Sequence, residues 1–377
     1  WRLLQKARQS AYEVPFENYE LRGRRLIQAD HFPSELDRAM NGLSRIGKTD
    51  LSFANYLRQH RAGPKFVHAR RLATHFVEGF DAADPELISA KSLAEEQEQI
   101  GDLEEDAQFR LIDGYDVLTD HLAQSLNSAK VELQLNSVVE QIDWRRSKIS
   151  AQCHSKGVTN AVSARHCIIT LPLSLLQAAD AQTGAIRFSP EIPNVRRAAN
   201  QLVMGQVVKV IFKFREPFWL QKGAIKTISS NQNLADAVFF HEPSAPFPTW
   251  WTTRPVQSSL LTAWAGGPKA IALSGLSPSA IVEAAIASLE QLFGRRRAWI
   301  KSIIEATYTH DWQSDPFSAG AYSYVKVGGL NARKQLAKPI EHTLFFAGEA
   351  TDISGQASTV AGAIVSGQRA ARQLLVS

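Results

Sequence analysis

The stretch TLFFAGEAT, residues 343–351, is an apolar run that ends in a glycine and a carboxylate. A short buried strand has this composition, so the acid is placed directly at the end of the strand. The small-residue segment SGQAST (354–359) follows, and STVAGAIVSGQRAARQLL (358–375) then shows the apolar spacing of an amphipathic helix. We therefore predict a strand, a turn and a helix whose first N–H groups point at an electron-rich ligand group.

Two residues of this stretch favour a ligand site. Gly348 removes a side chain where a ligand or another segment approaches. Glu349 can accept hydrogen bonds from hydroxyl groups, as acids do with ribose in dinucleotide sites. A plain strand-to-helix crossover, with Glu349 as a capping acid, is the alternative that the spacing leaves open.

The rest of the chain divides into a helical first part and a strand-rich remainder. Residues 1–71 are predicted to form helical pieces joined by polar turns, and the acidic segment 92–108 is predicted to be a solvated surface segment. From residue 131 onward, period-two patterns predict strands, among them VELQLNSVVEQIDW (131–144) and VVKVIFKF (207–214). A helix over 279–294 is predicted to end at its glycine.

Composition narrows the class of protein. The chain has 377 residues and a formal net charge of +5, and no apolar run approaches the length of a membrane span. Residues 1–71 carry 14 Lys and Arg against 7 Asp and Glu, whereas residues 72–120 carry 2 against 14. Such opposite segments can pair with each other, so the charge is a weak argument for nucleic-acid binding. Cys153 and Cys167 form neither a metal spacing nor a disulfide framework, which favours a reducing, cytoplasmic location.

The sequence contains no motif for several other common types of site. The ten histidines show no HxxxH or HExxH grouping, so we predict no metal site. No G-x-S-x-G is present, which argues against a hydrolase elbow. The glycine-plus-base stretches do not have P-loop spacing.

Five ordered stretches carry a family resemblance. They are TLPLSLL (170–176), VVKVIFKFREPFW (207–219), HDWQSDPFSAGAYSYV (310–325), TLFFAGEAT and STVAGAIVSGQRAA. Together they resemble the flavin-containing amine oxidases, which include monoamine and polyamine oxidases, L-amino-acid oxidases and flavin histone demethylases. The resemblance runs from about residue 110 to the end of the chain and is specific for the family but not for a substrate.

The resemblance implies FAD as the cofactor and assigns roles to matching positions. Lys209 matches the lysine that holds a water against the reactive edge of the flavin. Glu349, after Gly348, matches the acid that binds the ribityl or diphosphate portion, and Val139 matches the residue whose main chain contacts adenine. Without the resemblance, a lysine such as Lys209 in an alternating strand is more simply an outward residue.

The remaining matches concern the flavin ring and the amine pocket. Thr359 and Val360 match helix-start residues whose backbone meets the pyrimidine end of the isoalloxazine. Trp312 and Tyr322 match aromatic residues that pack by the flavin and wall the substrate pocket, although either could equally be a core aromatic. Thr359 also stands where monoamine oxidases place a second tyrosine, so the pocket is expected to be more open there.

One expected motif is not in this sequence. A flavin fold of this class holds the diphosphate with a GxGxxG turn, and no two glycines here are separated by one residue. We therefore expect an N-terminally incomplete form, or a partner chain that supplies the missing FAD-binding unit, and weak FAD binding by these 377 residues alone. A non-catalytic interaction module on a degenerate scaffold is the alternative.

The overall expectation is an α/β flavoprotein of two interwoven domains. The remaining Rossmann-like FAD-binding domain comprises 101–205 and 329–377, and a mixed-sheet and helix substrate domain comprises 1–100 and 206–328. The implied reaction oxidises an amine or amino acid to an imine and passes the electrons to dioxygen, which gives hydrogen peroxide. An amino-acid substrate would need an arginine for its carboxylate, and Arg254 is a candidate, although a structural role fits it as well.

Overall fold

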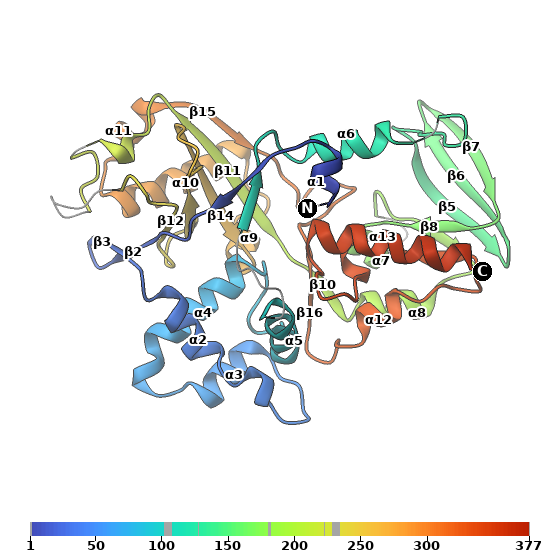
Figure 1. Cartoon of the computed structure of the whole chain (residues 1–377), viewed down its shortest axis with the longest axis horizontal. Coiled ribbons are helices and arrows are strands. Elements are labelled where there is room, and N and C mark those ends of the chain that lie inside the picture. The colour runs from blue at the N-terminus through green and yellow to red at the C-terminus, as the bar shows by residue number, and fades with distance from the viewer. Residues whose placement is uncertain are drawn as a thin grey trace.

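The structure is a computed structural model that describes residues 2–101, 108–126, 128–179, 182–221, 223–227 and 234–376. Figure 1 shows an elongated molecule whose two lobes meet near the strands β10 and β16. β10 (Leu202–Met204) and β16 (Ser323–Val325) pair antiparallel. The α/β class predicted from the sequence is confirmed.

One lobe is built on a seven-stranded mixed sheet with the order β15-β11-β14-β13-β12-β2-β3. Its strands are β2 (Asn18–Arg22), β3 (Arg25–Gln28), β11 (Val207–Phe214), β12 (Phe239–His241), β13 (Thr249–Trp251), β14 (Leu260–Gly266) and β15 (Ile304–Thr309). The pair β12–β2 is parallel, and the other pairs are antiparallel. The prediction that residues 1–71 are helical is therefore wrong for β2 and β3, which form one edge of this sheet.

The two faces of this sheet differ because side chains alternate along each strand. In β11, Val208, Val210, Phe212 and Phe214 are buried in the largest hydrophobic cluster. The long helix α10 (Pro278–Phe293) covers this face with its own buried residues and ends at Gly294 as predicted, and Gly294 has a left-handed conformation. The opposite face carries Lys209 and Trp264.

A layer of helices lies against the same lobe (Figure 1). It contains α2 (Phe32–Met40), η1 (Leu43–Arg45), α3 (Phe53–His60), η2 (Pro64–Phe66), α4 (Val67–Gly79) and α5 (Ala90–Gly101). The prediction of a solvated segment at 92–108 is wrong for α5, because Leu93 and Ala94 are buried in a core cluster with α3 and α4. Residues 102–107 lie outside the described residues.

The second lobe combines two small sheets and several helices. β5 (Val138–Arg145), β6 (Lys148–Ser155), β7 (Val158–Ala164) and β9 (Arg187–Ser189) form a four-stranded sheet, and β8 (Cys167–Ile169) pairs parallel with β17 (Leu344–Phe346). Its helical segments are α6 (Asp116–Gln124), α7 (Leu173–Gln177), α8 (Pro193–Ala199), α12 (Ala332–Leu336), η4 (Glu349–Thr351) and α13 (Val360–Leu375). Residues 131–137 do not extend the strand as predicted, since β5 begins at Val138.

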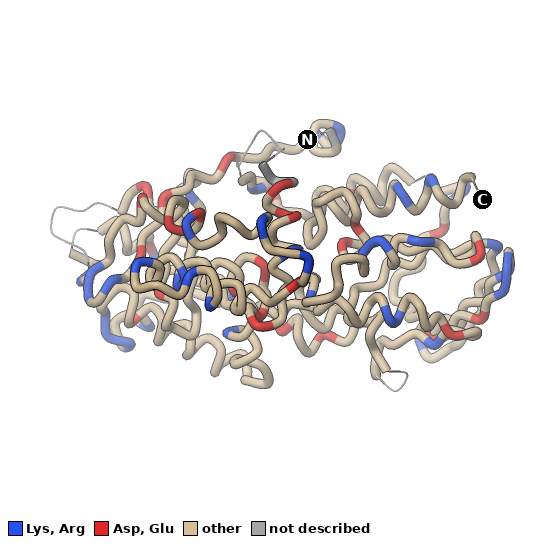
Figure 2. The backbone as a smooth tube through the Cα atoms, turned by 90° about the horizontal axis from the view of Figure 1, so that it is seen from below, with Lys and Arg blue, Asp and Glu red and all other residues tan. Residues whose placement is uncertain are grey.

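Short elements complete the chain. They are α1 (Arg2–Lys6), β1 (Ala11–Val14), which pairs with β4 (Gln108–Leu111), η3 (Phe218–Leu220), α9 (Pro268–Ala272) and α11 (Arg297–Ile303). Among the described residues, no helix combines the length and apolarity needed to cross a membrane. Acidic and basic residues are interspersed along the backbone (Figure 2), and the exposed pair Arg58–Glu86, at 2.6 Å, is one contact between the basic and acidic segments.

Candidate active site

A cavity of about 760 Å³ lies between the large sheet, the helical layer and the segment that leads into α13. The sheet contributes Asn18, Phe239, His241, Thr249, Trp251 and Trp264. The helical layer contributes His75, Phe76, Gly79, Phe80, Asp81, Ile88 and Glu96, and the α13 side contributes Tyr322, Ser323, Tyr324, residues 355–359 and Ala361. Its volume and its largely aromatic walls are typical of small-molecule sites.

The register of the sheet places one row of side chains along the cavity. Lys209 lies opposite Trp264, Trp264 opposite Thr249, and Thr249 opposite His241. Directly opposite residues share one face of a sheet, which is here the face turned away from the hydrophobic core. The Trp264 indole donates a 2.8 Å hydrogen bond to the Gly79 carbonyl, so the end of α4 is fixed against this wall.

Two buried histidines face each other at this wall, His241 in the row on β12 and His75 on the neighbouring helix α4. His241 Nε2 lies 2.9 Å from Asn18 Oδ1, and the facing nitrogens His241 Nδ1 and His75 Nε2 are 3.3 Å apart. Thr249 Oγ1 also lies 3.1 Å from His75 Nε2. Burial lowers the pKa of His75 to about 4 and lowers the pKa of His241 well below its usual value. Both imidazoles are therefore neutral near pH 7 and act as a hydrogen-bonded wall.

Glu349 connects three segments behind the cavity. Its carboxylate accepts hydrogen bonds from the Ser323 backbone N–H at 3.2 Å, the Ser323 hydroxyl at 2.7 Å and the Ser358 backbone N–H at 3.2 Å. The Arg333 guanidinium of α12 lies 3.8 Å away and donates to both Ser323 and Ser358. Burial raises the pKa of Glu349, while Arg333 and these hydrogen bonds act in the opposite direction. Glu349 thus positions the cavity loop from behind.

The start of α13 presents backbone to the cavity. Thr359 caps the helix, since its hydroxyl accepts a 3.0 Å hydrogen bond from the Gly362 N–H. Gly355 and Ser358 have left-handed backbone angles, with φ of 89° and 64°. A Cβ on Gly362 would lie 2.0 Å from the Gln356 carbonyl oxygen, so the loop can fold this closely onto the helix only with glycine there.

The structure brings some of the predicted site residues to the cavity. Tyr322 and Thr359 line it, and the Tyr322 hydroxyl donates a 2.7 Å hydrogen bond to the Phe80 carbonyl. Burial raises the pKa of Tyr322 above its usual range, so its phenol is neutral. Gly348, Glu349 and Val360 are not among the described lining residues, although Gly348, with φ of 112°, leads into Glu349 and Val360 begins α13 next to the lining residue Thr359 with a side chain that is 49% exposed.

Lys209, Trp312 and Val139 are likewise not among the described residues that line the cavity. Lys209 lies on the cavity-side face of β11 but is exposed. Trp312 is 46% exposed, and its ring centroid lies 4.3 Å from that of His310. Val139 is half-buried in β5, opposite Cys153, and packs against the core of the second lobe.

Arg254, the candidate for binding a substrate carboxylate, is also not among the described lining residues. Its guanidinium donates to Asp236 Oδ1 at 2.6 Å. Arg110 is the arginine in the lining, and it donates to the Thr252 carbonyl at 2.8 Å and lies over the Trp251 ring. The structural alternative for Arg254 is therefore the one that the contacts favour.

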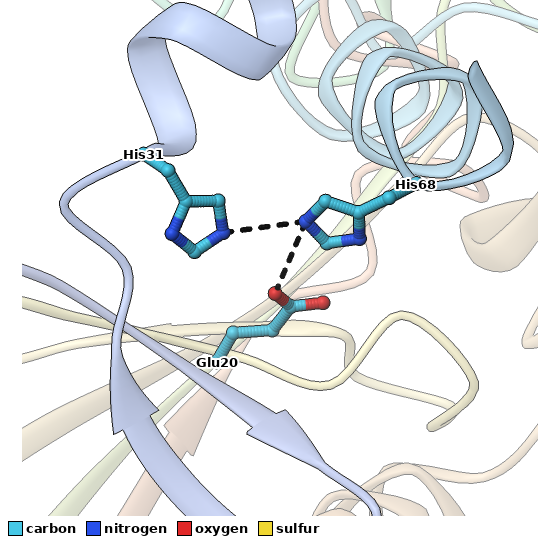
Figure 3. Close-up of side chains that lie close together, drawn as sticks. All are labelled: Glu20, His31 and His68. Atoms are coloured by element: carbon cyan, nitrogen blue, oxygen red, sulfur yellow. Dashed lines mark hydrogen bonds and ion pairs between the residues drawn. The ribbon is translucent and has the colours of Figure 1, made fainter. Parts of the chain in front are cut away.

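A side-chain cluster beside the sheet resembles a metal-ligand set. Figure 3 shows Glu20, His31 and His68 with their ligand atoms converging, and these atoms lie within 4.8 Å of one another. Arg22 donates to Glu20 at 2.9 Å and contacts both imidazoles, and Arg71 pairs with the same carboxylate. Two guanidinium groups already balance the charge of Glu20, so we interpret the cluster as an ion-pair network around one buried acid.

Comparison with known proteins identifies the family. The sequence model of the family described as "Flavin containing amine oxidoreductase" matches residues 16–375. The chain belongs to this family of flavin-containing amine oxidoreductases. Its cofactor is FAD, as the resemblance implied.

Similar proteins include demethylases and oxidases. Lysine-specific histone demethylase 1 homolog 3 of Arabidopsis thaliana is 29% identical over 271 residues, which cover 70% of this chain and 15% of the relative. Probable polyamine oxidase 5 of the same plant is 28% identical over 306 residues, which cover 70% of this chain and 54% of the relative. The chain thus spans less than two thirds of the length of either relative.

A solved structure shows the same fold. Putrescine oxidase bound to putrescine superimposes with a TM-score of 0.76 at 20% identity and covers 100% of this chain and 85% of its own.

The cavity fits one end of this cofactor. Aromatic side chains such as Trp264 and Tyr322 provide apolar walls for a flat ring. The capped start of α13 offers N–H groups to the ring's electron-rich edge, and the residues there, Ala357, Thr359 and Ala361, are small. The residues present thus suit the ring end of FAD.

Sequence reasoning missed several residues of the cavity. Asp81, Glu96, His75 and His241 gave no local signal, because each belongs to a segment that reads as ordinary helix, turn or strand. Arg333 gave no signal either, because it lies in the polar stretch NARKQLAKPIEH (331–342) before TLFFAGEAT.

Proposed function

We propose that this chain oxidises an amine to an imine with FAD and that dioxygen takes up the electrons to give hydrogen peroxide. The observation that carries the proposal is the convergence of aromatic walls, neutral polar groups and the start of α13 on one cavity in a member of the amine oxidoreductase family. FAD, when bound, accepts the hydride equivalent from the carbon that bears the nitrogen.

The residues of the chain would hold and orient the amine. The aromatic walls exclude water and favour the neutral form of the reacting amine, which keeps its nitrogen lone pair available. Neutral His75 and His241 add hydrogen-bonding capacity without repelling a cationic group, and the Glu349 network keeps the loop before α13 in place. Tyr322 is held by Phe80 and limits the cavity on the α13 side.

Lys209 is proposed to assist electron transfer to dioxygen. It lies opposite Trp264 on the cavity-side face, where a water held by its ammonium group can favour negative charge on the reduced ring. Gly348, Val360, Val139 and Trp312 stay proposed cofactor contacts. We also propose the interwoven division into 101–205 with 329–377 and 1–100 with 206–328, which the separate hydrophobic clusters of the two lobes support.

The test is amine-dependent reduction of bound FAD under anaerobic conditions, followed by hydrogen peroxide release on admission of air. It is run on this chain alone and on the chain joined to a segment carrying a GxGxxG unit, which we propose holds the diphosphate. Lys209→Met should slow reoxidation about tenfold to a hundredfold. Lys213→Met is the matched control, because Lys213 shares the strand and face but pairs with Glu305. Failure of every amine to reduce the flavin would contradict the proposal.

A further inference from the structure

Two acidic side chains line the cavity from the helical layer. Asp81 follows the end of α4, two residues after Gly79, and Glu96 lies on α5. The Ser92 hydroxyl donates a 3.1 Å hydrogen bond to Glu96 Oε1. The two acids therefore come from different helical segments and face the same space.

Asp81 leaves a hydrogen-bond acceptor unused inside the protein. Its Oδ2 is buried and has no hydrogen-bond partner among the described residues. Buried carboxylate oxygens are nearly always paired, because an unpaired one loses its hydration without compensation. An unpaired acceptor that lines a cavity therefore indicates a donor that arrives with a ligand.

The electrostatic surroundings of the pair are acidic. Burial raises the pKa of Asp81 well above its usual value, and the negative charge of Glu96 raises it further. Burial also raises the pKa of Glu96, with a smaller opposing effect from Arg333. The buried acid Glu20 is a useful comparison, because Arg22 and Arg71 both form ion pairs with it. Asp81 receives no such partner among the described residues.

We propose that Asp81 and Glu96 bind the second, non-reacting ammonium group of an aliphatic diamine or polyamine. The inference rests on the proposed amine oxidation and names the substrate class for that site. An ammonium group offers the N–H donor that Asp81 lacks and compensates the charge of both acids. The aromatic side chains Phe80 and Trp264 suit the methylene chain between the two nitrogens.

This arrangement would distinguish a diamine from a monoamine by its second charge rather than by its size. A monoamine of the same length would leave both acids without a cation, and sites with buried polar groups reject analogues that cannot pair with them. The cavity volume of about 760 Å³ suits a small aliphatic amine. A basic peptide that bound more tightly than a diamine would instead indicate a macromolecular substrate.

The experiment compares putrescine with butylamine, which has the same carbon chain and lacks the second ammonium group. Calorimetric titration of the FAD-loaded protein measures binding without depending on turnover. Asp81→Asn and Glu96→Gln should each weaken putrescine binding about tenfold or more and leave butylamine binding unchanged. Glu95→Gln is the matched control, because Glu95 is the exposed neighbour on the same helix.

The thermal midpoint of the variants separates a binding role from a structural one. Removing an unpaired buried acid should leave the midpoint of Asp81→Asn unchanged or raise it, whereas an acid needed for folding would give a lower midpoint. Equal binding of putrescine and butylamine by the parent chain, or no loss of putrescine binding in either variant, would overturn the inference even if amines are oxidised. Charge-dependent putrescine binding without flavin reduction would contradict the proposed oxidation and leave this site standing.

Discussion

Arg333 links the segments that hold the cavity loop, and replacing it tests how the loop is held. The guanidinium donates to the Ser323 hydroxyl at 3.0 Å, the Ser323 carbonyl at 3.1 Å, the Glu349 carbonyl at 3.3 Å and the Ser358 hydroxyl at 3.4 Å. Its side chain is 11% exposed. Arg333→Met keeps much of the side-chain volume and removes all four hydrogen bonds together with the charge.

We expect Arg333→Met to destabilise the fold by about 3–5 kcal/mol, because it leaves the carboxylate of Glu349 buried without its cation. The loss should depend on pH. Burial already raises the pKa of Glu349, and removal of Arg333 raises it further. The folded variant then binds a proton that the unfolded chain releases, so the stability of the variant falls as pH rises from the unfolded pKa of Glu to the folded one.

The assay is thermal unfolding followed by tryptophan fluorescence at about pH 5 and about pH 8. The midpoint of Arg333→Met should fall by about 5 °C or more, with the larger fall at the higher pH. Lys334→Met is the control, since Lys334 is the exposed neighbour on α12. A midpoint as high as that of the control at both pH values would refute the assigned role of Arg333.

Two further predictions concern α13 and the buried histidines. Gly362→Ala should destabilise the fold, because its Cβ would lie 2.0 Å from the Gln356 carbonyl, whereas Gly367→Ala, with no heavy atom within 4 Å, should stabilise the same helix by about 0.5–1 kcal/mol. Comparison of the two melting curves checks this, and equal effects would contradict it. Since the pKa of His75 falls from 6.5 to about 4 on folding, the unfolded chain binds the proton more readily, and stability should drop by about 3 kcal/mol from this residue as pH falls through that interval. In His75→Gln this acid-sensitive loss, measured by unfolding between about pH 7 and about pH 4, should be smaller, and an unchanged pH profile would contradict the assignment.

The elements that the sequence predicted well are those whose pattern reflects one buried face. β11 alternates between core residues such as Phe212 and polar residues such as Lys209, so its strand period is visible. β2 was missed because its second face is also buried. Asn18 and Glu20 on that face are polar residues with partners in the protein, and in a sequence they look like solvated positions.

The same distinction separates the predicted from the missed site residues. Glu349 and Thr359 belong to one local stretch, in which the strand, the acid and the helix start already indicate a ligand. Asp81, Glu96 and His241 become neighbours only when α4, α5 and β12 pack around the cavity. In the acidic run of α5, the sequence does not distinguish Glu96, which faces the cavity, from its neighbours that face solvent.

The two faces of the large sheet have different roles, and this difference explains how the fold stays stable with a polar cavity. One face packs Phe212, Phe240 and Trp250 into a continuous core with α10, and this burial fixes the strands. The opposite face can then hold His241 and its partners in hydrogen-bonded positions, although burying these groups costs stability. Asp81 lies beyond this hydrogen-bonded set, and its Oδ2 has no hydrogen-bond partner among the described residues, so we expect it to cost stability until a ligand supplies a donor. Ligand binding should therefore raise the stability of the helical layer more than that of the sheet, which gives the acid pair a signature in hydrogen exchange of α4 and α5.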